Sequence, residues 1–425
     1  MSGNPGSASP GSGMSGTPPA GAGTAGAPTV STLPPRPKTS RTPLLVAIIV
    51  VVVVIAAVLG YGAYALHWFG GGSTTCGGST GFTTGITSTQ SLAGAGSTFV
   101  APLMVQWTSG FSQNTSSCIQ VTYNSVGSGA GISQLTAKQV EFGASDAPLS
   151  PAQRGALPAP ALTLVDTVGG VVVMFNNGLS TGLHLNGTVV AGIYLGTITH
   201  WNDPTIAALN PTKTLPSTAI VVVHRSDSSG TTYQFTHWLS LDNATWKAKV
   251  GYATSVAWPT GIGEKGSAAV AAEVEGTTGA VGYVEQNYAG STIQYAAIEN
   301  PAGTFVLPST ANISVAANAV APSLPAPTGD WGNVTLLNQA GTDTYPISTW
   351  SYIMVYTDLG TAYGSSVTKE QAQALVNFLS WVVGVSTGQS LSTALEYVPL
   401  PASVSADGLT AIGEIQYHGA NLQTP

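Results

Sequence analysis

Charged side chains are scarce in this chain of 425 residues. It has 11 lysines and arginines and 18 aspartates and glutamates, so 7% of its residues are charged, where about a quarter is usual. Nucleic-acid-binding proteins need clustered cations to neutralise phosphates, and a formal net charge of −7 excludes that class. The two cysteines are too few for a disulfide-rich scaffold or a thiolate zinc cluster.

Apolar residues make up 43% of the chain. This content is enough to build large cores, and it excludes a wholly disordered protein. The length predicts two or three domains. The 52 glycines and 27 prolines follow no Gly-X-Y period, which excludes collagen.

The N-terminal part changes composition abruptly. Residues 1–42 are almost wholly Gly, Ala, Ser, Thr and Pro, and such a segment buries too little apolar surface to offset its ordering entropy, so we expect a disordered tail. Residues 43–69 contain LLVAIIVVVVVIAAVL and match the roughly 20 residues that cross a bilayer. A buried core helix and a cleavable signal peptide are the alternatives. The run is longer than a signal-peptide core, and no A-x-A site follows it.

Charge predicts the orientation of this transmembrane helix. Arg36, Lys38 and Arg41 stand just before it, and no charged residue occurs from 42 to 137. The positive-inside rule then places the tail in the cytoplasm and the rest of the chain outside. We predict a single-pass anchor in the cell membrane, followed by a flexible Gly- and Ser-rich linker over residues 70–91.

Both cysteines, Cys76 and Cys118, fall on the predicted outer side. In an oxidising exterior they could pair and fasten the linker to the domain. Two free or separately used thiols are the alternative, and the sequence leaves both open.

From residue 92 to 425, short apolar runs alternate with amphipathic stretches. This pattern favours an α/β fold with largely parallel strand pairing. More than 300 residues are too many for one core, so we expect two lobes. The expected strands are Ile119–Tyr123, Gly170–Phe175, Ala219–Val223, Gly279–Val284 and Tyr352–Tyr356. The expected helices are Ala101–Ser112, Ile132–Lys138, Val189–Leu195, Thr231–Leu239, Ala268–Val274 and Lys369–Val383.

Chemistry concentrates in four segments: LAGAGSTF at 92–99, YNSVGSGAGI at 123–132, EFGASDAPL at 141–149 and HRSDSSGTT at 224–232. Three of them put a small hydroxyl residue beside glycine just before an expected helix. The start of a helix offers unpaired N–H groups and partial positive charge, and the hydroxyl adds a donor, so each predicts an anion site. A helix N-cap with a turn is the alternative for each segment.

Arg225 is the second residue of the fourth segment and one of eight cations after residue 69. A guanidinium group matches two oxygens of one oxyanion, and a surface salt bridge is its alternative role. Eight cations against 18 carboxylates give 8 − 18 = −10 outside the predicted anchor. Long-range attraction therefore cannot capture an anion, and fixed local donors in a closed cleft must do so.

These segments resemble those of the phosphate-binding proteins that supply ABC-type phosphate transporters. The resemblance runs in order from residue 92 nearly to the C-terminus, and it includes IYLGTITHWNDPTIAALNP and GAVGYVE. It implies a two-lobed α/β fold of periplasmic-binding-protein type II, with lobe 1 at about 92–166 and 296–425 and lobe 2 at about 167–295. It further implies no enzymatic activity and no cofactor. The implied partners are inorganic phosphate and the permease and ATPase subunits of an ABC transporter.

By motif position, the resemblance implies a phosphate site of eight residues. They are Thr98, Phe99, Ser128, Asp146, Arg225, Ser229, Gly230 and Thr231. In this family pattern Asp146 accepts a proton from phosphate, and Arg225 pairs with the oxygens. The sequence departs from the pattern at Ser228, where glycine is common, and at His224, where a basic residue is frequent.

The carboxylate of Asp146 predicts that the site selects phosphate over sulfate. A carboxylate facing an oxyanion is repulsive unless a proton is shared. Hydrogen phosphate and dihydrogen phosphate carry one near neutrality, whereas sulfate does not, and such a site can reject the mismatched ligand strongly. Binding of sulfate or molybdate is the first alternative function. A phosphatase-like hydrolase is the second, and the scattered histidines do not favour it.

Overall fold

The computed structural model describes residues 76, 81–289 and 293–425. The predicted tail and anchor, and most of the linker up to residue 80, lie outside the described residues. Within the described part of the chain, no helix is long and apolar enough to span a membrane. Regular structure begins before residue 92, because Gly81–Thr83 forms the 3-10 helix η1 and the first strand starts at Gln90.

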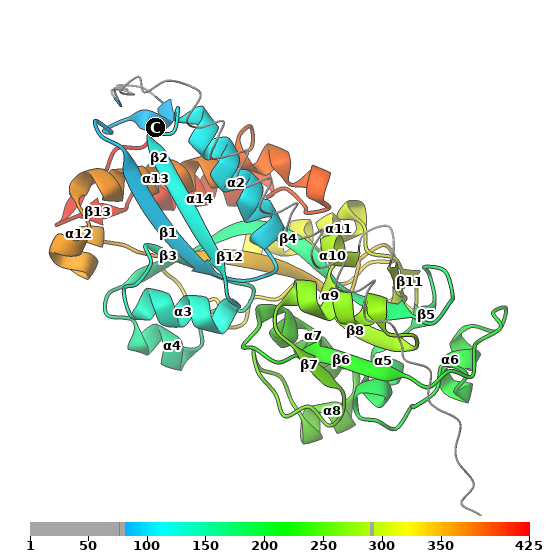
Figure 1. Cartoon of the computed structure of the whole chain (residues 1–425). Helices are drawn as coiled ribbons and strands as arrows, with labels where there is room; N and C mark the ends of the chain where they lie inside the picture. Colours follow the sequence, from blue (N-terminus) through cyan, green and yellow to red (C-terminus); the bar gives the residue numbers. More distant parts are fainter. Residues whose placement is uncertain (1–75, 77–80, 290–292) are drawn as a thin grey trace, which may run out of the picture. The chain divides into compact units, whose positions relative to one another are not determined.

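A nine-stranded mixed sheet runs through both halves of the described fold (Figure 1). Its order is β2-β1-β3-β12-β4-β8-β6-β7, and β9 pairs with β4 off this path. Its strands are β1 (Gln90–Gly96), β2 (Ile119–Ser125), β3 (Phe142–Ser145), β4 (Ala161–Asn176), β6 (Val221–Arg225), β7 (Ile262–Glu264), β8 (Ala280–Glu285), β9 (Gln294–Tyr295) and β12 (Ser348–Tyr356). Two small sheets combine β5 (His184–Leu185), β10 (Ala297–Glu299) and β11 (Phe305–Val306), and β13 (Gln416–Tyr417) with β14 (Ala420–Asn421).

Strand pairing is mixed, so the prediction of largely parallel pairing is wrong. β1 is parallel to β2 and β3, and β6 is parallel to β7 and β8. At the centre, however, β12 is antiparallel to β3 and β4, and β4 is antiparallel to β8. The physical reason is that β4 carries the chain from one half of the fold to the other and β12 carries it back.

The two halves of the sheet define two lobes, joined by β4. Residues 161–170 of β4 pair with β12 in the first lobe, which also contains β1, β2 and β3. Residues 171–176 pair with β8 in the second lobe, together with β6 and β7. The expected strand Gly170–Phe175 is therefore only the second half of a strand of 16 residues.

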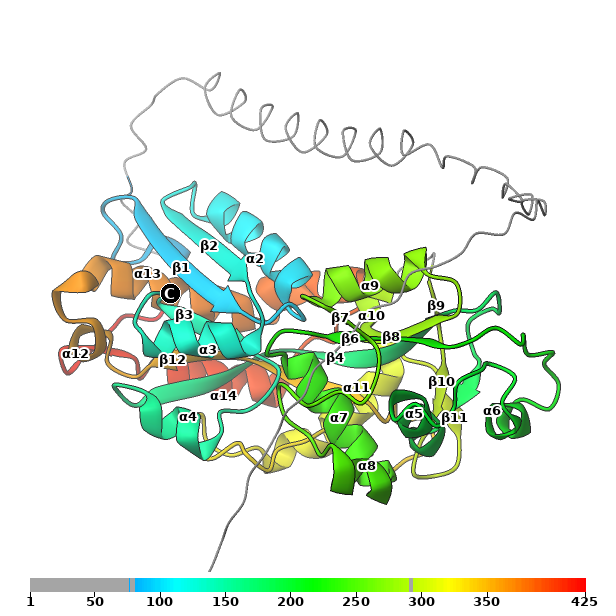
Figure 2. The ribbon, with the colours of Figure 1, turned by 60° about the horizontal axis from the view of Figure 1, so that its bottom comes forward.

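Helices cover both lobes (Figure 2). The first lobe contains α2 (Ala101–Asn114), α3 (Ser128–Thr136), α4 (Pro151–Ala156), α12 (Leu359–Tyr363), α13 (Lys369–Val383) and α14 (Ala402–Ile412). The second contains α5 (Gly187–Tyr194), α6 (Pro204–Leu209), α7 (Gly230–Asp242), α8 (Ala244–Lys249), α9 (Ser267–Gly276) and α10 (Gln286–Ala289), and α11 (Thr310–Val320) packs on β4 and β12. Short 3-10 helices are η2 (Ala321–Ser323), η3 (Gly364–Ser366), η4 (Gly388–Leu391) and η5 (Thr393–Leu395). The prediction for Lys369–Val383 is confirmed to the residue.

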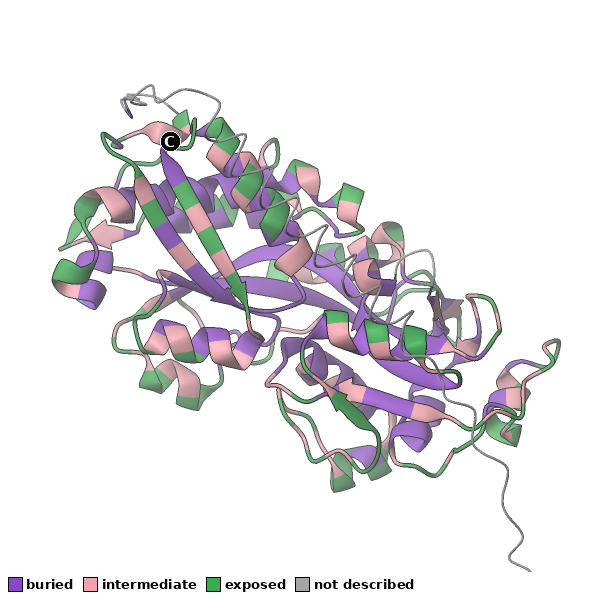
Figure 3. Cartoon of the chain, in the orientation of Figure 1, coloured by how far each residue is buried: buried purple, intermediate pink, exposed green. Residues whose placement is uncertain are grey.

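The core lies along the two central strands (Figure 3). All nine residues of β12 and residues 162–175 of β4 are buried, whereas in the edge strand β2 only Ile119 is buried and partly buried positions alternate with exposed ones after it. Helices α11, α13 and α14 contact β4. Because neither face of β4 meets water, its sequence is a near-continuous apolar run rather than an alternating one.

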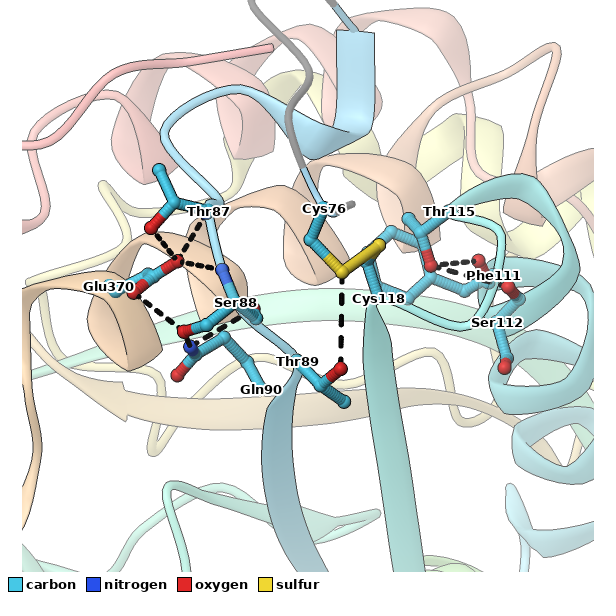
Figure 4. Close-up of a disulfide and its surroundings, with 10 residues drawn as sticks. All are labelled: Cys76, Thr87, Ser88, Thr89, Gln90, Phe111, Ser112, Thr115, Cys118 and Glu370. Atoms are coloured by element: carbon cyan, nitrogen blue, oxygen red, sulfur yellow. Dashed lines mark hydrogen bonds between the residues drawn. A yellow bond between two sulfur atoms is a disulfide. The ribbon is translucent and has the colours of Figure 1, made fainter. Parts of the chain in front are cut away.

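The two cysteines form a disulfide (Figure 4). Cys76 and Cys118 are bonded, with their Cα atoms 5.6 Å apart. Cys118 directly precedes β2, and its carbonyl accepts a hydrogen bond from the N–H of Gln90 at 2.8 Å. Glu370, in the first turn of α13, accepts from the N–H of Ser88 at 2.7 Å. The segment before β1 is thus fastened to the first lobe, and the alternative of two free thiols is wrong.

Candidate functional site

Four helices begin where the two lobes meet. The loop before α2 places the Thr98 hydroxyl 3.0 Å from the Ser267 hydroxyl at the start of α9. The N–H of Gly230, at the start of α7, donates to Ser128 Oγ at the start of α3, also at 3.0 Å. Each of these contacts joins one lobe to the other. The starts of four helices therefore converge at the junction, and their partial positive charge makes it a setting for an anion.

The structure brings all eight predicted site residues to this junction, and all eight are buried. Thr98 and Phe99 come from the loop before α2, and Ser128 from the start of α3. Asp146 follows β3, and Arg225 ends β6. Ser229, Gly230 and Thr231 form the start of α7.

Asp146 is surrounded by serine hydroxyls. Ser97 Oγ lies 2.7 and 2.6 Å from its two carboxylate oxygens, and Ser351 Oγ donates to Oδ1 at 3.0 Å. Burial raises the pKa of Asp146 to about 7, and the charge of Glu285 adds to the rise, although the Ser97 hydrogen bond opposes it. The carboxyl group is therefore poised to exchange a proton near neutrality.

Ser97 was missed by the sequence analysis, although it lies inside the GAGSTF segment. Besides its contact with Asp146, its Oγ accepts a hydrogen bond from the N–H of Phe99 at 2.9 Å. The Ser97 side chain thus holds both the loop before α2 and the carboxyl group of Asp146 in place. Its place beside the predicted residues Thr98 and Phe99 was the available signal.

Arg225 forms a buried ion pair, not the surface salt bridge that was its alternative role. Its Nε and Nη2 donate to the two oxygens of Asp227 at 2.7 and 2.6 Å, and its side chain is 1% exposed. The remaining nitrogen, Nη1, lies 3.0 Å from Ser267 Oγ and 3.5 Å from Thr231 Oγ1. Burial opposes the charge, but the hydrogen bonds and charge of Asp227 raise the pKa of Arg225. The guanidinium therefore directs one nitrogen toward the junction.

Two small residues, Ser229 and Gly230, shape the start of α7. Ser229 Oγ accepts from the N–H of Thr232 at 3.1 Å, so this hydroxyl caps the helix. A Cβ atom on Gly230 would lie 2.6 Å from Asp146 Oδ2. Only glycine lets the helix start approach the carboxyl group of the other lobe this closely.

Glu285 is a second buried carboxyl group that sequence reasoning did not assign. It ends β8, is 1% exposed, and its Oε1 accepts a hydrogen bond from Thr231. Its other oxygen, Oε2, has no hydrogen-bond partner among the described residues. The only available signal was its place at the end of the GAVGYVE segment.

Comparison with known proteins places the chain in a family. Residues 82–385 match a model described as a PBP superfamily domain. The phosphate-binding protein PstS of Xylella fastidiosa (strain Temecula1) is 37% identical over 328 residues, covering 75% of this chain and 84% of the relative. The PstS of Pasteurella multocida is 39% identical over 325 residues, covering 75% and 88%. This chain belongs to the PstS family of phosphate-binding proteins.

The fold of this PstS-family chain also resembles solved structures. A putative phosphate ABC transporter substrate-binding protein from Clostridium perfringens, solved with bound phosphate, covers 73% of this chain and 100% of its own, with a TM-score of 0.52 and 18% identity. The two-lobed α/β fold of periplasmic binding proteins, predicted from the resemblance, is confirmed.

The two departures from the PstS pattern have structural consequences. The Ser228 carbonyl accepts from the N–H of Gly129 in the other lobe at 3.1 Å, and the Ser228 hydroxyl donates to Thr254 at 2.9 Å. The Ser228 side chain fits because Gly129 has no Cβ, which would lie 2.1 Å from Ser228 Oγ. His224 stacks on Trp258 with ring centroids 4.7 Å apart, and burial lowers the pKa of His224. It therefore adds no positive charge near neutrality.

Proposed function

We propose that this chain captures inorganic phosphate outside the cytoplasm and delivers it to an ABC transporter. The observation that carries the proposal is the junction of the lobes, where four helix starts, serine and threonine hydroxyls, Arg225 and the buried carboxyl group of Asp146 come together. The PstS relatives are named phosphate-binding proteins, which supports this ligand. The chain acts as a binding protein and not as an enzyme.

In this proposal the eight predicted residues bind phosphate. Both lobes donate hydrogen bonds to the phosphate oxygens through backbone N–H groups and hydroxyls. The donors of the first lobe are Thr98, Phe99 and Ser128, and those of the second are Ser229, Gly230 and Thr231. Arg225 directs Nη1 at the oxygens while Asp227 holds the other two nitrogens. Charge-assisted hydrogen bonds in a closed, dry site are stronger than in water, so local donors overcome the negative net charge.

Asp146 selects between ligands according to whether the ligand carries a proton. It accepts hydrogen bonds from serine hydroxyls in this structure, and phosphate would add a proton donor. Sulfate carries no proton near neutrality and would leave two buried negative charges facing each other. The site therefore favours phosphate over sulfate and molybdate, which are the alternative ligands.

We also propose the membrane anchor and the domain boundaries predicted from the sequence. Residues 43–69 span the membrane once, residues 1–42 form a cytoplasmic tail, and the chain from residue 70 lies outside. The Cys76–Cys118 disulfide supports an oxidising exterior. Full-length protein should stay with membranes after a high-salt wash, and a chain starting at residue 70 should be released. Release of both would refute the anchor.

The ligand is tested on residues 73–425, which form one compact unit. Calorimetric titration with phosphate, sulfate and molybdate should show phosphate binding most tightly. Arg225→Lys should weaken phosphate binding because lysine cannot hold the two-pronged pair with Asp227. Arg154→Lys, on α4 outside the junction, should bind like the wild type. Absence of phosphate binding, or tighter binding of sulfate, would refute the proposed function.

A further inference from the structure

The proposed phosphate site is closed off from water. All eight of its residues are buried, and even the side chain of Thr98 belongs to a residue that is 7% exposed. An ion can therefore enter or leave only when the two lobes separate at their junction. Contacts between the lobes hold the site shut, and two of these contacts come from side chains outside the predicted eight.

The first of these side chains is Gln234, on α7 of the second lobe. Its Nε2 donates to the backbone carbonyl of Asp146 in the first lobe at 2.6 Å, and Gln234 is 4% exposed. Gln234 stands one turn after Gly230, on the same face of the helix. A Cβ atom on Gly230 would lie 2.7 Å from the backbone nitrogen of Asp146. This face of α7 therefore rests directly on the backbone of Asp146.

Tyr288 makes the corresponding contact at a second point of the junction. It belongs to α10 of the second lobe, and its hydroxyl donates to the backbone carbonyl of Thr98 in the first lobe at 2.9 Å. Burial raises the pKa of Tyr288, so the hydroxyl keeps its hydrogen at neutral pH. Like Gln234, Tyr288 thus holds a backbone carbonyl that belongs to a residue of the proposed phosphate site.

We propose that Gln234 and Tyr288 are positioning residues that latch the two lobes together around bound phosphate. Both hydrogen bonds run from one lobe to the other, so both must break when the lobes separate. In the open form the same groups bond to water. The net gain of each bond on closure then corresponds to about a two- to tenfold change in the equilibrium constant. This inference rests on the proposed function.

The latch should act on the release of phosphate and not on its capture. Capture starts from the open form, in which neither hydrogen bond is present, whereas release must break both of them. Removal of one donor should therefore raise the dissociation rate constant and the dissociation constant by the same factor. The association rate constant, which is the ratio of the two, should stay unchanged.

The test compares Gln234→Leu and Tyr288→Phe with the wild type of residues 73–425. Each substitution removes the donor and nearly preserves the size of the side chain. Loss of radiolabelled phosphate after dilution into unlabelled phosphate gives the dissociation rate constant, and calorimetry gives the dissociation constant. Each variant should release phosphate about two to ten times faster. Gln106→Leu, at an exposed position of α2, and Tyr252→Phe, at a residue 46% exposed, are the matched controls and should behave like the wild type.

Thermal unfolding separates a latch from a contact that only supports the fold. Without phosphate the lobes are free to open, so both variants should melt at the wild-type temperature. With phosphate in excess both should melt at a lower temperature than the wild type, because weaker binding stabilises the folded state less. Should Gln234→Leu not fold, Tyr288→Phe decides the test, because it removes only a hydroxyl group.

The outcomes are distinguishable. Release at the wild-type rate in Tyr288→Phe, a changed association rate constant in place of a changed dissociation rate constant, or an equal fall in melting temperature with and without phosphate would overturn this inference. Failure of the wild type to bind phosphate would instead overturn the proposed function.

Discussion

Arg225 and Asp227 form a two-pronged ion pair, in which Nε and Nη2 of the arginine donate to the two carboxylate oxygens at 2.7 and 2.6 Å. Asp227 also accepts from the N–H of Gly266 at 3.1 Å, so its carboxylate is fixed at the residue that caps α9. The pair leaves Nη1 of Arg225 to face the junction of the lobes. Asp227 therefore directs the only buried cation of the described site while neutralising much of its charge.

This pair predicts the effect of Asp227→Ala. The variant leaves a buried guanidinium without its partner, which should lower the free energy of unfolding by about 3 kcal/mol and weaken phosphate binding by about tenfold or more. Denaturant unfolding and calorimetry measure the two effects. Asp343→Ala, at an exposed position, is the matched control. Unchanged phosphate affinity in Asp227→Ala would contradict the directing role.

Selectivity should depend on Asp146. Asp146→Asn removes the proton acceptor and its charge, so phosphate should bind more weakly and sulfate should be repelled less. We expect the ratio of the two affinities to fall on the order of a hundredfold. Competition calorimetry with phosphate and sulfate measures the ratio. A ratio equal to that of the wild type would remove Asp146 from this role.

The raised pKa of Asp146 predicts how stability depends on pH. Because its pKa is about 7 in the folded protein and 3.8 ordinarily, the folded state binds the proton more tightly between these values. The free energy of unfolding should then fall by about 1.4 kcal/mol for each pH unit as pH rises from about 4 to about 7. Above pH 7 this contribution is constant.

Thermal and denaturant unfolding of wild type and Asp146→Asn, without ligand, isolates this effect. Asp166, whose pKa burial also raises, contributes a slope of the same sign to both proteins. The difference between them therefore reports Asp146, together with the effect of its charge on the pKa of Asp166. Equal slopes in the two proteins would contradict the prediction.

Ser267 should strengthen phosphate binding, although no motif pointed to it. Its hydroxyl lies 3.0 Å from both Thr98 Oγ1 in the first lobe and Arg225 Nη1 in the second. Ser267→Ala removes both contacts and should weaken phosphate binding about tenfold, with Ser267→Thr less affected. Ser403→Ala, on the exposed surface of α14, should bind normally. Wild-type affinity in Ser267→Ala would exclude this role.

Reduction of the disulfide should destabilise the domain. The Cys76–Cys118 bond closes a loop with a sequence separation of 42, and the loss of such a constraint on the unfolded chain costs about 2–4 kcal/mol. The melting temperature of the wild type should fall when a reductant is added. The double variant Cys76→Ser, Cys118→Ser should already melt at the lower temperature and should not respond. Phosphate affinity should change little, because the bond lies away from the junction.

Short-range patterns in the sequence were enough to predict most of the helices and the four segments of the site. α13 matches its predicted bounds because an apolar face at helical spacing follows the N-cap Thr368. The eight predicted residues meet because each follows or opens a regular element that ends at the junction. The four segments show which residue types lie at the ends of these helices and strands. The loops are short, so the residues stay close to the ends of the elements that they join.

Strand β4 shows where the sequence was insufficient. Its 16 residues include Asp166 and the pair Gly169–Gly170, which stand before its most apolar part, and only Gly170–Phe175 was predicted as a strand. The strand is stable across these residues because β12 pairs with its first part and β8 with its second. That support comes from residues more than a hundred positions away, so no local pattern could predict it.

The sequence by itself determined that few charges are available and that small hydroxyl residues and glycine stand at the helix starts, because these follow from composition and short-range spacing. Tertiary structure alone decided which hydroxyls meet the carboxyl group of Asp146 and which groups of the two lobes meet each other. Ser351 and Asp146 are 205 positions apart, and Thr98 and Ser267 are 169 apart. The first contact arises only when distant segments of the first lobe pack together, and the second only when the two lobes meet. Burial at this junction raises the proton affinity of Asp146.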